Sequence, residues 1–478
     1  MDDKTQNIQS GSQPPQSEPV AQNTPIQPQA NNAWTPQGAS QTKPEEDFGS
    51  KGPLSPSNIT KLLVGIFAIL TLAFVLFIFI VPNIGKGSEK VTLSYWGVLE
   101  DPTVMQPIIS DFEKENPKIT VDYKKQDIKD YKERLATRIS QGTGPDIFGF
   151  QNTWYPAFSQ VLLPMPSDTV SKDQFNKSFY PVAKKDLIQN GGIYGIPTGV
   201  DTLSLFVNTE IFKQAGVNIP KNWNDFINAA RSLTVKDQTG KIKTSGAALG
   251  TFDNVTHAAD IISLFFVQDG VDLDNLTSSK ERVSDALRFY TAFALGDGSV
   301  WDGSLDPSSL AFSKGNLGMF FGYYWDYFAI KSANPQLAFE IDSVPQLNFQ
   351  SQTISTYYAE GVSAKSKNQQ QALAFMKFLA RRDTQEKLYQ AQSRARAYGQ
   401  PPAMIDLSDK LQNTPISIIV SQAKNATSSY FAGEPIDNSL RSYLSTAVSS
   451  ILTGTPPAAA ADALITGVSQ TLSQYSKK

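Results

Sequence analysis

Apolar and polar positions alternate along residues 90–116 in the order expected for a strand followed by an amphipathic helix. Residues 91–96 carry the alternation of a strand. Asp101 followed by Pro102 is typical of the start of a helix, with a capping residue before a proline in the first turn. Apolar side chains then recur at helical spacing until the Asn116-Pro117 stop.

The same pattern repeats along residues 119–150. Residues 119–123 predict a second strand, residues 131–139 a second helix, and residues 146–150 a third strand. Strand, helix, strand, helix and strand at this spacing predict a parallel sheet with right-handed crossovers. Ligands of such sheets bind beyond the carboxyl ends of the strands. The loops that begin at Gly97 and Gln151 are therefore the first candidates for a site.

Further strands and helices continue to the end of the chain. Asn222 with Asp225 predicts a capped helix, and residues 372–379 have one apolar helical face. So many elements over residues 90–478 predict two α/β lobes. We expect one lobe at about 90–200 and 357–400, and the other at about 205–350 and 401–478. The chain would then pass between them near 200–207 and 355–362.

Two different segments precede this globular part. Residues 1–57 are rich in Gln, Pro, Asn and Ser and poor in aliphatic residues, which predicts a disordered tail. Residues 58–83 contain the uncharged run Leu62–Val81, which has the length of a membrane-spanning helix. A cleaved signal peptide is the rival interpretation, but the preceding tail is long and no small-residue cleavage site follows Val81. We therefore predict a retained single-pass anchor.

Composition narrows the chemistry that this chain can perform. The net charge of −3 argues against a general affinity for nucleic acid. The chain has no cysteine and one histidine, His257, which excludes disulfides and thiolate metal sites and makes a Ser/His/Asp triad implausible. A phosphate-binding Gly-x-x-x-x-Gly-Lys loop is absent from the sequence. We expect no metal, no cofactor and no catalytic residue.

Six stretches of residues 90–478, in the right order, resemble bacterial extracellular solute-binding proteins of the maltose-binding type. They include the Gly142-Thr143-Gly144-Pro145-Asp146 turn and a Phe-x-x-Gly-x-x-x-Met motif that ends at Met319. In chain order, the stretches are Val91–Gly97, Arg134–Ile147, Tyr194–Asn208, Pro220–Phe226, Phe312–Met319 and Gly361–Asn368.

The resemblance implies a two-lobed periplasmic-binding-protein-like fold with hinge crossovers and a ligand held between the lobes. It implies a protein that captures a solute, most often a sugar, for the permease subunits of an ABC importer, and that catalyses nothing itself. The binding domain would lie outside the cell membrane and the tail in the cytoplasm. The retained anchor departs from relatives that are soluble or carry a lipidated cysteine.

A sugar site combines aromatic surfaces, which stack on the sugar ring, with carboxylates and amides that bond its hydroxyl groups. Loop positions after strands suggest the first candidates, and the resemblance adds Asp201 and places a stacking aromatic in the run that contains Tyr324 and Trp325, both of which we select. The ligand-binding candidates are Trp96, Glu100, Gln151, Asn152, Trp154, Asp201, Asn254, Tyr324, Trp325, Tyr358 and Glu360.

Structural roles compete with several of these interpretations. Trp96 is as consistent with core packing as with a site, and Glu360 with support of the hinge. His257 is expected to be structural, and Arg396 is expected to solvate a helix end.

Three alternatives to sugar import stay open at this point. The first is a glycosidase with paired carboxylates, the second is a ligand-binding sensor or surface scaffold, and the third is a binder of a polyol or another polar solute.

Overall fold

The computed structural model describes residues 64–71, 90–347 and 351–476. The chain divides into two units, Met1–Gly85 and Lys86–Lys478. In the first unit residues 64–71 are helical, and most of the apolar side chains of this helix are exposed. None of the helices within the described ranges combines the length and apolar character that crossing a membrane requires. The predicted tail 1–57, and most of the predicted anchor Leu62–Val81, lie outside the described residues.

The second unit contains two lobes, each built on its own five-stranded sheet. In the first lobe β2 and β3 lie parallel to β1, as the sequence pattern predicts. Strand β14 pairs antiparallel with β3, and β6 pairs antiparallel with β14. The strands in spatial order are β2 (Ile119–Lys125), β1 (Val91–Gly97), β3 (Ile147–Gln151), β14 (Tyr358–Val362) and β6 (Ile196–Pro197).

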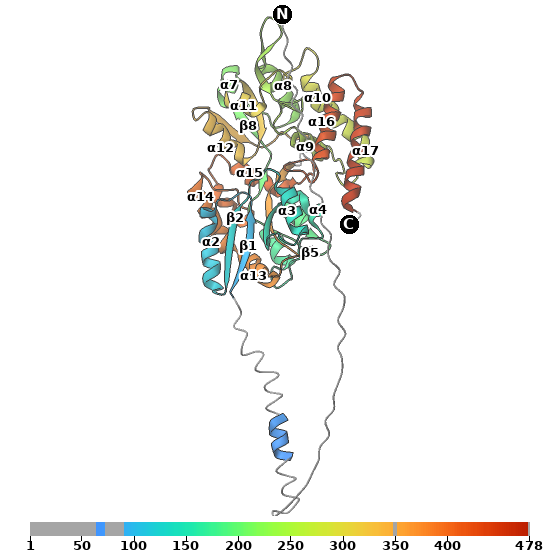
Figure 1. The fold of residues 1–478 in the computed structure, drawn as a ribbon. Helices are drawn as coiled ribbons and strands as arrows, with labels where there is room; N and C mark the ends of the chain where they lie inside the picture. The colour runs from blue at the N-terminus through green and yellow to red at the C-terminus, as the bar shows by residue number, and fades with distance from the viewer. Residues whose placement is uncertain (1–63, 72–89, 348–350, 477–478) are drawn as a thin grey trace, which may run out of the picture. The chain divides into compact units, whose positions relative to one another are not determined.

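Helices cover this first sheet and close its core. The buried positions of α2 are Val104, Met105, Ile108, Ile109 and Phe112, the apolar face expected from the sequence. Figure 1 shows α2, α13 and α14 beside β1 and β2. The helices of this lobe are α2 (Pro102–Glu115), α3 (Tyr131–Ser140), α4 (Tyr155–Phe158), α5 (Lys172–Ser178), α6 (Pro181–Leu187), α13 (Gln369–Leu379) and α14 (Arg382–Ala395).

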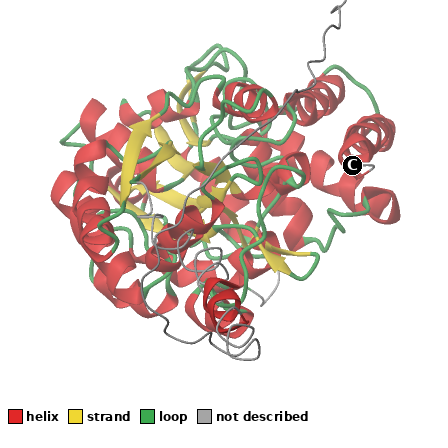
Figure 2. Ribbon diagram, turned by 60° about the horizontal axis from the view of Figure 1, so that its bottom comes forward, coloured by secondary structure: helices red, strands yellow, loops and turns green. Residues whose placement is uncertain are grey.

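The second lobe is built on a mixed sheet in which β8 and β11 are central and antiparallel. Both strands are buried along their whole length, since helices pack around them. In spatial order the strands are β12 (Phe339–Asp342), β8 (Ser204–Asn208), β11 (Leu317–Gly322), β10 (Ile242–Ala247) and β9 (Val235–Lys236). Figure 2 shows strands in the interior of the lobes with helices outside them.

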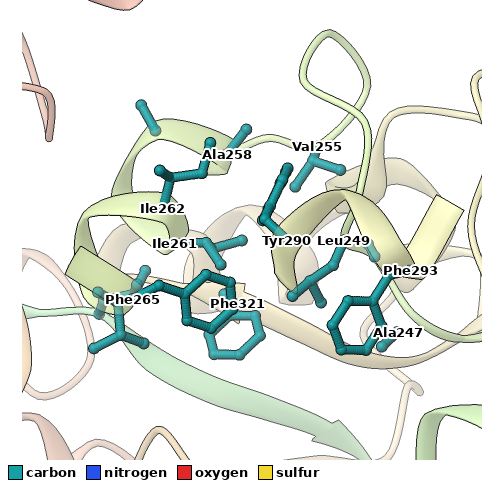
Figure 3. Close-up of a cluster of buried hydrophobic side chains, with 14 of the residues drawn as sticks. Ala247, Leu249, Val255, Ala258, Ile261, Ile262, Phe265, Tyr290, Phe293 and Phe321 are labelled. Carbon is teal, nitrogen blue, oxygen red and sulfur yellow. The ribbon is translucent and has the colours of Figure 1, made fainter. Parts of the chain in front are cut away.

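A dense aromatic core fixes the helices of this second lobe. Figure 3 shows Ile261 and Phe265 of α9 close to Phe321 of β11, with Tyr290 and Phe293 beside them. Almost every residue of α9 is buried, so its first turn is held rigidly. The helices are α7 (Thr209–Ala215), α8 (Trp223–Leu233), α9 (Ala258–Gln268), α10 (Lys280–Thr291), α11 (Ser308–Ser313), α12 (Tyr324–Ala333), α16 (Asn438–Leu452) and α17 (Pro457–Ser476).

A small third sheet joins the lobes. It consists of β7 (Asp201–Thr202), β13 (Thr353–Thr356) and β15 (Ala426–Thr427). The chain runs from β7 into β8, and from β13 into β14, so two of the passages between the lobes lie in this sheet. The Ser355 hydroxyl donates to the Asp201 carbonyl at 2.8 Å and ties the two passages together.

The C-terminal part of the chain packs against both lobes. Short helices η4 (Ile405–Leu411) and α15 (Ser417–Gln422) follow α14. Met404 and Leu407 pack in the core of the first lobe, although the sequence-based bounds assign residues after 400 to the second. Helices α16 and α17 pack on α10 in the second lobe. Residues 426–437 therefore form a third passage between the lobes.

Candidate functional site

A cavity of about 710 Å³ is lined by both lobes and by the joining sheet. Its first-lobe wall comes from β3, β14 and the loops after β1 and β2, and its second-lobe wall comes from the starts of α9, α12 and α16. The lining residues are Leu99, Ile128, Gln151, Asp201, Thr256, His257, Asp260, Tyr323, Tyr324, Trp325, Phe328, Thr356, Tyr357, Tyr358, Arg396, Gln400, Gly433, Glu434 and Arg441.

Trp325 gives the second-lobe wall an exposed aromatic surface. It lies in the first turn of α12, where the chain leaves the buried strand β11. Its ring stacks on Tyr323 with a centroid distance of 4.6 Å and an interplanar angle of 22°. The side chain nevertheless stays 47% exposed. One face of the indole is therefore supported by Tyr323, and much of the ring is free to contact a ligand.

Buried polar groups fix the position of this aromatic pair. His257 Nε2 and Asp326 Oδ2 are 2.8 Å apart, and the same carboxylate oxygen accepts the Tyr323 N–H at 2.8 Å. Burial alone would lower the pKa of His257, but the negative charge of Asp326 and the hydrogen bond to it raise the pKa overall. The histidine thus supports the start of α12, and it also lines the cavity.

Asp201 connects the joining sheet to the same helix. Its two carboxylate oxygens accept the Tyr324 N–H at 3.1 and 3.0 Å, and Oδ1 also accepts the Thr202 N–H at 2.8 Å. Burial raises the pKa of Asp201 well above its usual value, and these backbone donors act in the opposite direction. Asp201 therefore lines the cavity and, at the same time, caps the start of α12.

The first-lobe wall is polar at its base and apolar at its rim. The Gln151 amide donates to the Thr356 hydroxyl at 2.8 Å. Gly433 packs so closely here that a Cβ would lie 2.3 Å from Gln151 Nε2, and its φ of 61° favours glycine. At the rim, Leu99 and Ile128 are 38% and 50% exposed. Leu99 and Ile128 of the first lobe and Trp325 of the second lobe thus all present apolar surface to the cavity.

Arg396, which lines the cavity, forms an ion pair with the buried carboxylate of Glu100. The Arg396 guanidinium donates to both oxygens of Glu100, at 2.9 and 2.6 Å. Burial would lower the pKa of Arg396, but the hydrogen bonds and charge of Glu100 raise it. Glu100 does not line the cavity and instead neutralises a residue that does. The expectation that Arg396 merely solvates a helix end is wrong, because its partner comes from a loop far away in the sequence.

Of the eleven candidates, Gln151, Asp201, Tyr324, Trp325 and Tyr358 line the cavity. The structure does not bring Trp96 or Asn254 to it. Trp96 is half-buried against the core of the first lobe. The Asn254 amide donates to the carbonyls of Asp302 and Leu305 at 2.9 and 3.1 Å, and its oxygen accepts the Trp301 N–H. Asn254 therefore fixes a loop of the second lobe.

The remaining candidates are also used inside the protein. Asn152 donates to Asp186 at 2.9 Å. Trp154 stacks on Phe158 and donates its indole N–H to the Glu434 carbonyl at 2.8 Å, which ties the first lobe to the third passage. Glu360 is buried in the first sheet, where burial raises its pKa to about 8.

Sequence reasoning missed several lining residues. Glu434 and Arg441 lie in the third passage and the start of α16, where no pattern distinguishes a ligand-facing side chain from a solvated one. Asp260, in contrast, is grouped with Asn254 and His257 as a second-lobe lining residue from the sequence, and it lies in the first turn of α9 at the cavity. Among the described residues, no three His, Asp or Glu side chains converge as a metal site would require.

Two lobes, a joining sheet and a cavity between the lobes define a two-lobed, periplasmic-type binding protein. The family described as "Bacterial extracellular solute-binding protein" matches residues 96–386, which is more than half of the chain. The chain therefore belongs to this family, which confirms the resemblance drawn from the sequence. The family consists of binding proteins.

Curated relatives match at low identity. The "Multiple sugar-binding protein" of Streptococcus mutans is 24% identical over 319 residues, covering 63% of this chain and 74% of that protein. The "Arabinooligosaccharide-binding protein" of Halalkalibacterium halodurans is 31% identical over 166 residues, or 32% of this chain and 34% of the relative. For a Brucella abortus protein described as a binding protein, the match is 26% identical and spans 37% of its length.

Solved structures support the fold over nearly their whole length. A cyclo/maltodextrin-binding protein complexed with maltotetraose aligns with a TM-score of 0.66 and 15% identity, covering 81% of this chain and 98% of the other. The sugar-binding protein MalE from the phytopathogen Xanthomonas citri aligns with a TM-score of 0.65 and 18% identity, covering 80% and 98%. At these identities the likeness extends to the fold alone.

Proposed function

We propose that this protein captures a carbohydrate in the cavity between its lobes and delivers it to the permease subunits of an ABC importer. Family membership supports a solute-binding role. The names of two relatives, a multiple sugar-binding protein and an arabinooligosaccharide-binding protein, support a sugar as the solute. This support for a sugar comes from the family and the relatives' names. The aligned solved structures support the fold only.

This function is supported most directly by the surface of the cavity. Trp325 offers an exposed indole from the second lobe, and Leu99 and Ile128 offer apolar rims from the first. Sugar rings have apolar faces that stack on such surfaces, while their hydroxyl groups need hydrogen-bonding partners. Gln151 and Tyr358 supply polar groups from the opposite wall. We propose these residues, with Asp201 and Tyr324, as the ligand contacts.

Binding is proposed to act by closure of the lobes. A ligand that contacts both walls binds more tightly when the lobes are closer, and it shifts the population towards that state. The joining sheet is the place where such a rotation is absorbed, because both main passages run through it. The closed form is the one proposed to dock on the permease. The protein itself carries out no reaction.

The membrane tether remains part of the proposal. The run Leu62–Val81 would anchor the chain as a single span, with the lobes outside the cell and residues 1–57 inside. Tethering would keep the binding protein at the membrane that holds its permease. Fractionation of cells that express the full chain, before and after an alkaline wash, tests this: recovery in the soluble fraction would refute the anchor.

A thermal-shift screen of the purified full chain tests the carbohydrate assignment. A ligand that binds only the folded state raises the melting temperature in a concentration-dependent way. We expect a rise with at least one member of a panel containing maltotetraose, mannobiose and arabinotriose, alongside polyols, amino acids and polyamines. A rise with another solute class and none with any saccharide would refute carbohydrate binding.

A further inference from the structure

Buried polar atoms without partners are concentrated at this cavity. In the described part of the chain, six buried side-chain nitrogen or oxygen atoms have no hydrogen-bond partner, and three of them belong to lining residues. These three are Asp260 Oδ2, the Tyr358 hydroxyl and Arg441 Nε. An unpartnered buried polar group destabilises the free protein, so three of them around one cavity indicate groups that a ligand satisfies.

Only one of the two carboxylate oxygens of Asp260 accepts hydrogen bonds within the described part of the protein. Its Oδ1 accepts the Tyr323 hydroxyl at 2.7 Å and the Gly433 N–H at 3.1 Å. These two bonds fix the carboxylate, and the rigid first turn of α9 fixes its backbone. The side chain is only 1% exposed. Oδ2 is thus a positioned acceptor with no donor of its own.

Arg441 is the adjustable member of the group. Its Nη2 lies 3.8 Å from Asp260 Oδ2, which is too far for a hydrogen bond, and its side chain is 37% exposed. The other arginine of the cavity, Arg396, already uses two of its donors on Glu100, which also balances its charge. Arg441 therefore has free donors beside a free acceptor, and a small side-chain rotation brings both to one ligand.

Tyr358 faces this pair from the first lobe. It belongs to β14 and packs its ring edge-on against Trp154, with centroids 6.0 Å apart. Its hydroxyl, unlike that of Tyr357, has no partner in the protein. Tyr358 thus brings a donor or acceptor to the wall opposite Asp260 and Arg441, so the three groups can contact one ligand only if it spans the cavity.

We infer that Asp260, Arg441 and Tyr358 form a polar subsite that reads the hydroxyl groups of an uncharged saccharide. This inference rests on the proposed function. Two neighbouring hydroxyls satisfy the pair on the second lobe, one donating to Asp260 and the other accepting from Arg441. A uronic acid or a sugar phosphate also suits Arg441, but it places its charge against Asp260 and in a cavity that Glu434 also lines. An amino sugar meets the opposite conflict at Arg441.

Tyr358→Phe tests the subsite with the least disturbance, because it removes one unpartnered hydroxyl and keeps the ring. The matched control is Tyr430→Phe, which removes another unpartnered buried hydroxyl outside the cavity lining. Arg441→Met and Asp260→Asn complete the set. The probes are maltotetraose, mannobiose and arabinotriose, with trigalacturonate as the acidic probe and chitotriose, fully deacetylated, as the cationic one. Affinity of the full chain is measured by titration calorimetry.

We expect an uncharged probe to bind most tightly. Tyr358→Phe should weaken it roughly five- to tenfold, and Arg441→Met and Asp260→Asn roughly ten- to hundredfold, because their bonds involve charged groups. Tyr430→Phe should change the affinity less than twofold, and neither Tyr→Phe variant should lower the melting temperature.

Wild-type affinity in all three cavity variants would overturn the subsite while leaving carbohydrate binding intact. Tighter binding of trigalacturonate or deacetylated chitotriose than of every uncharged probe would overturn the uncharged class. If no saccharide binds at all, the proposed function fails and the inference fails with it.

Discussion

Replacing Trp325 by alanine should separate binding from stability. The indole is 47% exposed, and a tryptophan side chain offers about 150–250 Å² of contact area. Roughly 80–100 Å² is therefore available to a ligand. At about 25 cal/mol per Å² this area contributes roughly 2 kcal/mol, or about a thirtyfold change in affinity. Because so much of the ring is already in water, its removal should lower the free energy of unfolding far less than removal of a core aromatic.

The assay is titration calorimetry of the full chain with the saccharide that gives the largest thermal shift. The matched control is Leu310→Ala on α11, where the leucine is 42% exposed and does not line the cavity. We expect Trp325→Ala to lose about thirtyfold in affinity and Leu310→Ala to bind as the wild type does. Equal affinities of Trp325→Ala and the wild type would refute stacking on this residue.

Three further predictions concern the ionisable side chains Glu360, Asp186 and Arg396. Burial raises the pKa of Glu360 to about 8, so the folded protein keeps a proton that the unfolded chain releases near 4.5, and stability falls as the pH rises between these values. Glu360→Gln should remove this loss, with a gain of roughly 2–4 kcal/mol at pH 8.5 and little near pH 4.5 in denaturant titrations. Asp186→Ala leaves three hydrogen-bond donors without an acceptor and should cost roughly 2–4 kcal/mol, with Asp186→Asn costing less. Arg396→Ala leaves Glu100 buried and unpaired and should cost roughly 3 kcal/mol, measured as a fall in melting temperature; an unchanged melting temperature would contradict the buried pair.

Local patterns were sufficient for the first lobe's strand and helix order. Pro102 begins α2 and the chain leaves that helix at Asn116, as the capping and stop signals predict. The pairing of β14 with β3, by contrast, joins segments about two hundred residues apart in an antiparallel direction. No local periodicity reports such a pairing, because the partner of a strand is chosen by the packing of the whole lobe.

The site was predictable where the sequence itself is unusual. Trp325 stands in an aromatic run directly after a buried strand, and that run marks the second-lobe wall. Trp154 and Asn254 are also residue types that often bind sugars. Their side-chain N–H groups, however, donate to backbone carbonyls inside the protein. Sequence cannot tell towards which side a loop residue points. Arg441 gave no signal, since an arginine on an amphipathic helix is most often solvated.

The measurement that tests the central claim most directly is the distance across the cavity with and without saccharide. The chain contains no cysteine, so Lys129→Cys in the first lobe and Ser332→Cys on α12 in the second, both exposed positions, can carry the only two spin labels. Pulsed electron paramagnetic resonance then gives their distance distribution. We predict a shift to shorter distances with the saccharide that raises the melting temperature. An unchanged distribution at a saturating concentration would contradict capture between closing lobes.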